Sequence, residues 1–155
     1  MKSTNIKLLI LLLCLPLMTA CDWADLPTYE EAEISAVQFD YRWASDAKDP
    51  ITGEPVVKEV RMNTTSVVDS STGTISATVT VPPADENLPQ NIHDQITSSR
   101  LWGQVTVSTA ARITPIEGSA ALGTPDDWSK ERKFLVEAAN GTKKIWTIKI
   151  VQFNK

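Results

Sequence analysis

Apolar residues alternate with polar ones along much of this chain, and this period of two constrains the fold more than any other feature. In residues 75–81, Ile, Ala and Val alternate with Ser and Thr. In residues 37–43, Val, Phe, Tyr and Trp alternate with Gln, Asp and Arg. Successive side chains of a β-strand point to opposite faces, so both stretches predict half-buried strands. No stretch after residue 21 shows a sustained helical period.

Turn signals separate the alternating stretches. Asn140-Gly141 lies between residues 134–138 and residues 146–150, which both alternate. It predicts a hairpin with a type I′ turn, in which both central residues have positive φ. Residues 84–99 are polar, contain Pro89 and are expected to be irregular. Short strands with turns every ~8–12 residues predict a single all-β domain, an antiparallel β-sandwich.

The first 21 residues form a second distinct pattern. Lys2 and Lys7 precede an apolar run, residues 8–18, and Thr19-Ala20-Cys21 follows it. A basic start, a short apolar segment and small residues before a cleavage point are typical of a secretory signal. The alternative, a transmembrane helix, would need about 20 apolar residues, and this run is shorter. A cysteine after the small pair resembles the lipobox of bacterial lipoproteins.

The lipobox resemblance implies a division of the chain. Residues 1–20 are a signal peptide that is removed, and Cys21 carries acyl chains as the new N-terminus. Residues 21–31 are acidic and contain a proline, so we expect a short tether. Residues 32–155 form the domain.

Charge and cysteine content limit what this domain can bind and how it is stabilised. Loss of Lys2 and Lys7 with the signal changes the net charge from −4 to −6. An acidic domain is not expected to bind nucleic acid, and its membrane attachment must come from the acyl chains on Cys21. The two cysteines are Cys14, in the signal, and Cys21. The domain is therefore expected to fold without disulfides, on its hydrophobic core alone.

Several strand and turn motifs of the sequence are recognisable in combination. They are Thr74 to Pro82, Ile113-Thr114-Pro115, Glu117-Gly118, Asp127-Trp128-Ser129, Phe134 to Thr142 and Ile145 to Ile150. This combination, which spans about 75–80 residues, resembles the Ig-like domains of Bacteroidetes lipoproteins. The resemblance implies an Ig-like β-sandwich on a cell-envelope lipoprotein, in a family that is mostly of unknown function and that often accompanies outer-membrane polysaccharide uptake. The family has no settled functional residues to carry over.

The sequence offers little material for catalysis or metal binding. His93 is the only histidine, whereas a zinc site or a nucleophile–base pair needs several converging groups, so we expect His93 to be a solvated loop residue. Adjacent acids on a strand point to opposite faces, so the pair Asp126-Asp127 does not form a glycosidase site by itself. Asp46 with Asp49, or Asp126-Asp127, are the candidate calcium ligands, but we expect them to be solvated loop acids. We expect no catalytic residues, no metal and no cofactor.

The five tryptophans are the best candidates for ligand contact. Trp146 and Trp43 are in phase with inward-facing apolar residues and are expected in the core, and Trp128 is expected to close the end of the core. Trp102 is out of phase with Leu101 and the alternating residues after it, so we expect it to face outwards. Trp102 is therefore the candidate ligand-binding residue, with packing at the edge of the core as the alternative.

These observations lead to a non-enzymatic, lipid-anchored protein of the outer membrane, with the cell surface and the periplasmic face as the two alternatives. We expect it to bind other molecules, as an accessory module of a glycan-uptake or adhesion system. The expected partners are outer-membrane proteins or glycans. The alternative is a carbohydrate-binding protein that uses Trp102. A glycoside hydrolase is a weaker alternative, because it would need two acids facing each other across a cleft.

The lipidation site is directly testable. Cys21→Ser should abolish incorporation of labelled fatty acid, because the acyl chains are expected on the Cys21 thiol and amine. Labelling and membrane fractionation of the wild-type and variant proteins would check this. A variant that is still acylated would contradict the lipobox interpretation.

Overall fold

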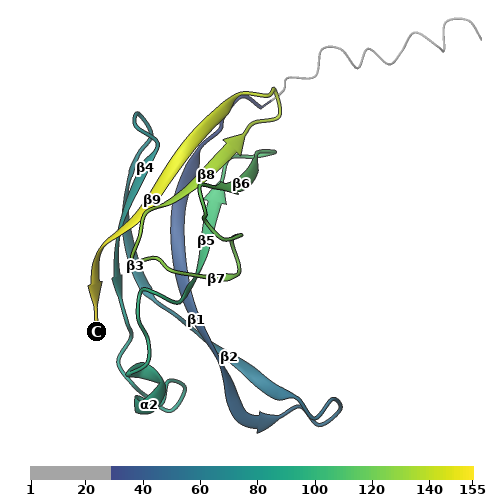
Figure 1. The fold of residues 1–155 in the computed structure, drawn as a ribbon, viewed down its shortest axis with the longest axis vertical. Coiled ribbons are helices and arrows are strands. Elements are labelled where there is room, and N and C mark those ends of the chain that lie inside the picture. The colour runs from purple at the N-terminus through teal and green to yellow at the C-terminus, as the bar shows by residue number, and fades with distance from the viewer. Residues whose placement is uncertain (1–28) are drawn as a thin grey trace, which may run out of the picture.

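The computed structural model describes residues 29–155. This part of the chain forms nine strands and a helix of one turn (Figure 1). No helix in it is long and apolar enough to cross a membrane. The elements are β1 (Ile34–Lys48), β2 (Pro55–Arg61), β3 (Asn63–Asp69), β4 (Thr74–Thr80), α2 (Gln90–His93), β5 (Leu101–Val107), β6 (Arg112–Ile116), β7 (Pro125–Asp126), β8 (Arg132–Glu137) and β9 (Lys143–Asn154).

The strands form two sheets that pack as a sandwich, which confirms the prediction of an all-β sandwich. Sheet A has the order β2-β1-β5-β7, and sheet B has the order β3-β4-β9-β8-β6. All strand pairs are antiparallel except β4 with β9, which is parallel. The sandwich is therefore mixed rather than wholly antiparallel. Parallel neighbours need a long connection, and here four further strands lie between β4 and β9 in the sequence.

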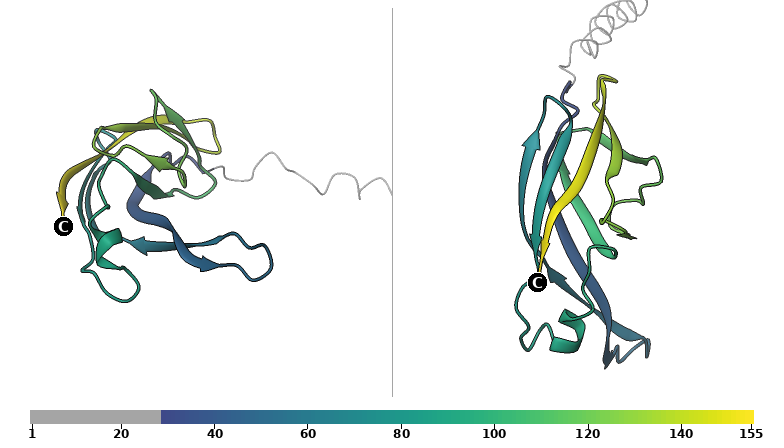
Figure 2. Two further views of the ribbon diagram at one scale, coloured as in Figure 1. Left: turned by 60° about the horizontal axis from the view of Figure 1, so that its bottom comes forward. Right: turned by 60° about the vertical axis from the view of Figure 1, so that its left-hand side comes forward.

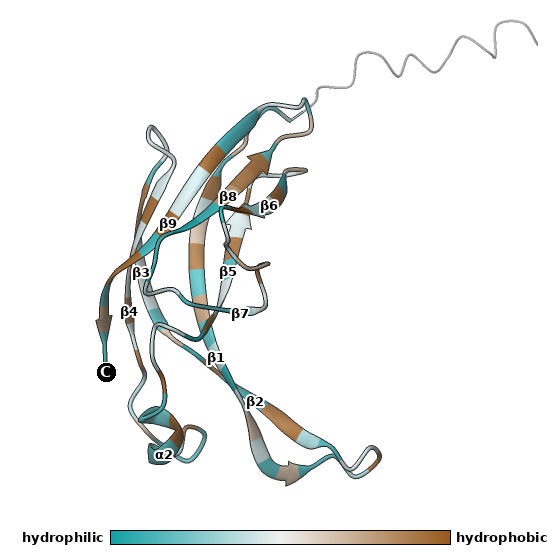
Figure 3. Cartoon of the chain, viewed as in Figure 1, coloured by the Kyte–Doolittle hydropathy of each residue, from teal (hydrophilic) through white to brown (hydrophobic). Residues whose placement is uncertain are grey.

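The core follows the alternation of the strands, visible as bands of opposite hydropathy in Figure 3. Along β4, residues 75, 77 and 79 are fully buried while their neighbours are partly exposed. On β8 and β9, Phe134, Trp146 and Ile148 are also fully buried. The indole N–H of Trp146 donates to the carbonyl of Ala32 at 2.9 Å, so the buried ring leaves no unpaired donor.

Trp128 lies between the two sheets. Its ring meets Phe39 of sheet A edge-on at 4.9 Å and stacks on Phe134 of sheet B at 6.3 Å. Its indole N–H donates to the Leu101 carbonyl at 3.1 Å. Gly103 on β5 leaves room for this ring, because a Cβ at that position would overlap the Trp128 side chain. Trp128 and Trp146 are thus core residues, as expected, whereas Trp43 is only partly buried at the edge of the core.

The turn between β8 and β9 differs from the type I′ turn that the sequence predicted. Gly141 has φ of +87°, but Asn140 is not among the residues with positive φ. Ala138 N–H donates to the Thr142 carbonyl at 2.8 Å, and Gly141 N–H donates to the Ala138 carbonyl at 3.0 Å. This is a three-residue loop with a left-handed glycine, in which one residue rather than two needs positive φ. The hairpin itself and the positive φ of Gly141 are confirmed.

The two ends of the sandwich differ in what they carry. The described chain begins beside the β8–β9 turn, where the Tyr29 carbonyl accepts from Asn140 N–H at 3.2 Å. The β1–β2 hairpin and α2 lie at the opposite end (Figures 1 and 2). The irregular stretch predicted at residues 84–99 contains α2 and is held to the core by Leu88 and Ile96, which are buried.

Gly103→Ala should destabilise the domain by about 3 kcal/mol, because the added methyl overpacks the core against Trp128. Thermal and denaturant unfolding would measure the loss. The double variant Gly103→Ala with Trp128→Phe should lose less than the sum of the two single changes. Strict additivity would contradict the direct contact.

Gly141→Val should cost about 1–3 kcal/mol, because a β-branched residue is strained at positive φ. No atom outside its own chain neighbours lies within 4 Å of the position of a Cβ there, so the cost isolates backbone strain. Gly141→Asn is the matched control, since Asn tolerates this conformation, and it should be nearly neutral. Equal unfolding midpoints for the two variants would contradict this account of the turn.

Candidate functional site

Trp102 lies on the outer face of sheet A, away from the second sheet. On β5 it pairs with Asp40 of β1 on one side and with Pro125 of β7 on the other. Its neighbours Leu101 and Gly103 point into the core. The out-of-phase position in the sequence therefore corresponds to an outward side chain, and the ligand-binding role of Trp102 stays a prediction.

The Trp102 ring also packs on the edge of the core. It is partly buried and meets Tyr41 edge-on, with ring centres 6.3 Å apart. Tyr41 in turn stacks on Trp43 at 6.3 Å. The rings of Tyr41, Trp43 and Trp102 thus form a cluster near the first residues of β5. The two alternatives for Trp102, packing at the core edge and contact with a ligand, are therefore compatible, because the ring packs on Tyr41 but is only partly buried.

Two arginines approach the Trp102 ring. The guanidinium carbons of Arg42 and Arg100 each lie 5.9 Å from its centre, which is cation–π distance. Arg42 Nε lies 3.1 Å from Glu59 Oε2, an ion pair without hydrogen-bond alignment. An open depression of about 330 Å³ lies here. Its lining residues, which we call the arginine–tryptophan patch, are Arg42, Trp43, Ala44, Val57, Arg100 and Trp102.

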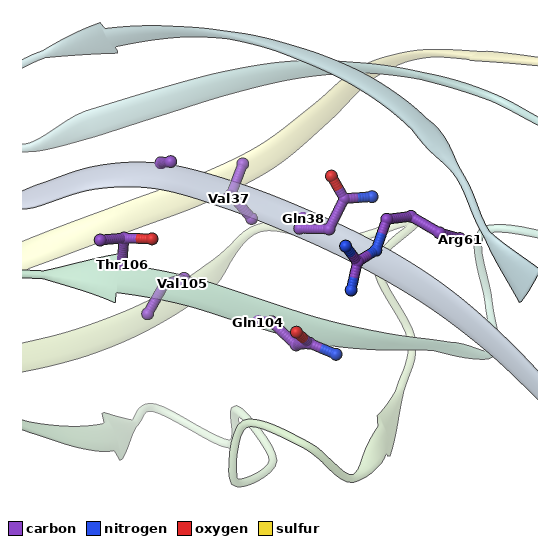
Figure 4. A pocket seen from close by; sticks show the side chains of 7 residues that line it. Val37, Gln38, Arg61, Gln104, Val105 and Thr106 are labelled. Carbon is purple, nitrogen blue, oxygen red and sulfur yellow. The ribbon is translucent and has the colours of Figure 1, made fainter. Parts of the chain in front are cut away.

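A second depression, of about 220 Å³, lies on the same face of sheet A (Figure 4). Gln38, Arg61, Gln104 and Thr106 contribute polar side chains to it. Gln38 donates to the Met62 carbonyl at 2.7 Å, which holds this amide in place. The outer face of sheet A therefore combines an aromatic and cationic depression with a polar one.

Asp40 lies on β1 between Gln38, which lines one depression, and Arg42, which lines the other. Its side chain is only 3% exposed although it lies on the outer face. Arg61 Nε lies 3.4 Å from one carboxylate oxygen, and the Gln104 amide donates to the other. A buried carboxylate is tolerated only when it is paired and hydrogen-bonded, and both conditions are met. Asp40 thus positions Arg61 and Gln104 rather than offering a free acid to a ligand.

Three of the acids considered from the sequence, Asp49, Asp126 and Asp127, accept hydrogen bonds from neighbouring groups. Asp126 pairs with Arg132 at 2.6 Å and accepts from Ala120 N–H at 2.9 Å. The Ser129 hydroxyl donates to Asp127 and lowers the pKa of that carboxyl. Two backbone N–H groups of the β1–β2 turn donate to Asp49 and lower its pKa in the same way. Among residues 29–155, no three potential metal ligands come together.

His93 is less exposed than a solvated loop residue would be. It lies on α2, its side chain is 15% exposed, and Nδ1 is 3.4 Å from Asp94. Cys21 lies outside the described residues, so its lipidation and the boundary between residues 20 and 21 stay predictions.

Sequence reasoning missed one surface feature. A depression of about 390 Å³ lies beside the β1–β2 hairpin and α2. Trp43, expected in the core, contributes to its wall together with Lys58 and Asn91. The signal that could have shown this is the position of Trp43 near the end of its alternating stretch, where a strand passes beyond the core.

Comparison with known proteins shows the family. Residues 34–149 match the family model described as DUF5018-related, so the chain belongs to this family of domains of unknown function. The crystal structure of a candidate secreted protein from Bacteroides fragilis is similar, with a TM-score of 0.76 and 45% sequence identity. The match covers 83% of this chain and 100% of that one. No curated protein matches. The expectation of a Bacteroidetes domain of unknown function is confirmed.

Proposed function

We propose that this protein is a non-enzymatic, lipid-anchored interaction module of the bacterial cell envelope, with an Ig-like sandwich that binds a partner protein through the outer face of sheet A. The observation that carries the proposal is the arginine–tryptophan patch. Trp and Arg dominate the binding energy of protein interfaces, since each combines a large contact area with polar groups. Here Arg42 and Arg100 flank Trp102 on an open face.

The envelope location rests on two observations. The N-terminal sequence resembles a lipoprotein signal, and the Bacteroides fragilis relative is described as a candidate secreted protein. We place the protein in the outer membrane, held by acyl chains on Cys21. The domain begins at one end of the sandwich, so a tether from that end leaves the broad face of sheet A free to meet a partner (Figure 1).

The non-enzymatic part of the proposal rests on the groups around the depressions of sheet A. Hydrolysis of a glycoside needs two carboxyl groups on either side of the bond. The outer-face acids Asp40 and Glu59 are each paired with an arginine, so neither is free to act as one of these two groups.

Direct carbohydrate binding is the second candidate. The polar depression favours it, because Gln38, Gln104 and Arg61 supply hydrogen-bonding groups suited to hydroxyls. The arrangement around Trp102 weighs against it, since a sugar that stacks on the ring must compete with two guanidinium groups. We therefore favour a protein partner.

Trp102→Ala should abolish capture of the partner by the purified domain from solubilised outer membranes. It should also lower stability by about 2 kcal/mol, because a partly buried aromatic ring is lost. Trp102→Phe keeps the contact with Tyr41 and should weaken capture with a smaller loss of stability. Val67→Ala is the matched control, as an exposed apolar residue of sheet B, and should leave capture unchanged.

Capture that survives Trp102→Ala would contradict the proposed face. A glycan array in which the wild-type domain binds and Trp102→Ala does not would instead support the carbohydrate candidate. The unfolding midpoint of each variant shows whether a loss of capture reflects the site or the fold.

A further inference from the structure

Arg42 and Arg100 approach the same tryptophan ring on the outer face of sheet A. Asp40 of β1 pairs with Trp102 of β5 in an antiparallel register, and Arg42 lies two residues beyond Asp40 on β1. Arg100 lies just before β5 begins, in a turn where its N–H donates to the Thr97 carbonyl at 3.3 Å. Each guanidinium carbon lies 5.9 Å from the centre of the Trp102 ring, and both arginines line the same depression.

Like charges that approach one ring repel each other unless counter-charges offset them. Glu59 offsets the charge of Arg42, and Asp40 offsets that of Arg61. In the described part of the chain, no acidic side chain lies within ion-pair distance of Arg100, which is exposed. The patch therefore carries positive charge that an incoming anion would neutralise.

Arginines are also concentrated on the outer face of sheet A, although the chain as a whole is acidic. The chain has five arginines, and three of them, Arg42, Arg61 and Arg100, are on the outer face of sheet A or at its border. The whole chain is nevertheless acidic, with a net charge of −4. Arginine binds carboxylates through a planar pair of N–H groups and stacks on aromatic rings, which lysine does less well. The pattern points to carboxylate groups as the ligand.

The apolar residues of the patch indicate which other groups the ligand has besides its carboxylates. Val57 is 66% exposed on the edge strand β2, and Ala44 and Trp43 lie beside it. Exposed apolar groups next to arginines suit a ligand that has both carboxylates and apolar side chains. A polypeptide has both, whereas an acidic polysaccharide offers carboxylates and hydroxyls.

We propose that the arginine–tryptophan patch binds an acidic segment of a partner protein, with Arg100 and Arg42 holding its carboxylates and Val57 and Trp102 contacting its apolar side chains. This rests on the proposed function and names the chemistry of the partner. In an extended segment, side chains on one face repeat every ~6.8 Å, the same spacing as along β1 and β5. The same-face side chains of an extended segment that lies along these strands therefore have the same spacing as the residues of the patch.

The test uses a labelled peptide of alternating glutamate and valine, titrated into the domain and followed by fluorescence anisotropy. We expect binding that is at least tenfold tighter than that of a glutamine–valine peptide and that weakens as salt is raised. Arg100→Ala should weaken it at least fivefold. Arg100→Lys should weaken it at least threefold although the charge is kept. Arg112→Ala, which removes an exposed arginine of sheet B, should leave it unchanged.

Several outcomes would overturn the proposal. Equal binding of the two peptides would show that charge is not recognised, and an equal effect of Arg112→Ala would show general attraction to the surface. Binding of polygalacturonate that depends on Arg100, without peptide binding, would make the ligand an acidic polysaccharide. Absence of binding by all probes would also overturn it. Partner capture that depends on Trp102 but tolerates Arg100→Ala would refute this inference and leave the proposed function standing.

Discussion

The contact between Trp128 and Gly103 is the constraint on which the rest of the structure depends. Trp128 comes from the segment between β7 and β8, yet its ring lies on Phe39 of sheet A and Phe134 of sheet B. Only a glycine on β5 leaves the space for it. The ring therefore sets how closely the sheets approach without any disulfide in the domain. Because Gly103 is held against Trp128, its neighbour Trp102 must point to the opposite face, which places the candidate site.

The outer face of sheet A holds a buried carboxylate whose two oxygens are both paired. Asp40 is almost fully buried, but Arg61 and the Gln104 amide satisfy both of its oxygens. Removing Arg61 would leave the buried charge without its ion pair, and removing the Gln104 amide would leave one oxygen without a hydrogen bond. This pairing holds Gln104 and Arg61 beside Trp102. Side chains held in this way would lose less entropy if they bound a ligand.

Exposed charge and buried charge have different roles on this face. Asp40 and Arg61 form a structural pair, whereas Arg100 has no acidic partner among the described residues. The approach of Arg42 and Arg100 to one ring distinguishes this patch from the ion pair between Glu117, in the turn after β6, and Lys133 of β8, which raises the pKa of the lysine.

The sequence by itself determined the local features of the protein. Period-two alternation predicted the strands, and phase alone predicted that Trp146 lies inwards and Trp102 outwards, because a side chain's face depends only on its position along the strand. Tertiary structure decided the rest. The parallel pairing of β4 with β9, the approach of Arg42 to the Trp102 ring and the partial burial of Trp43 all depend on which strands become neighbours and in what register. The first two join residues far apart in the chain, and no local pattern records them.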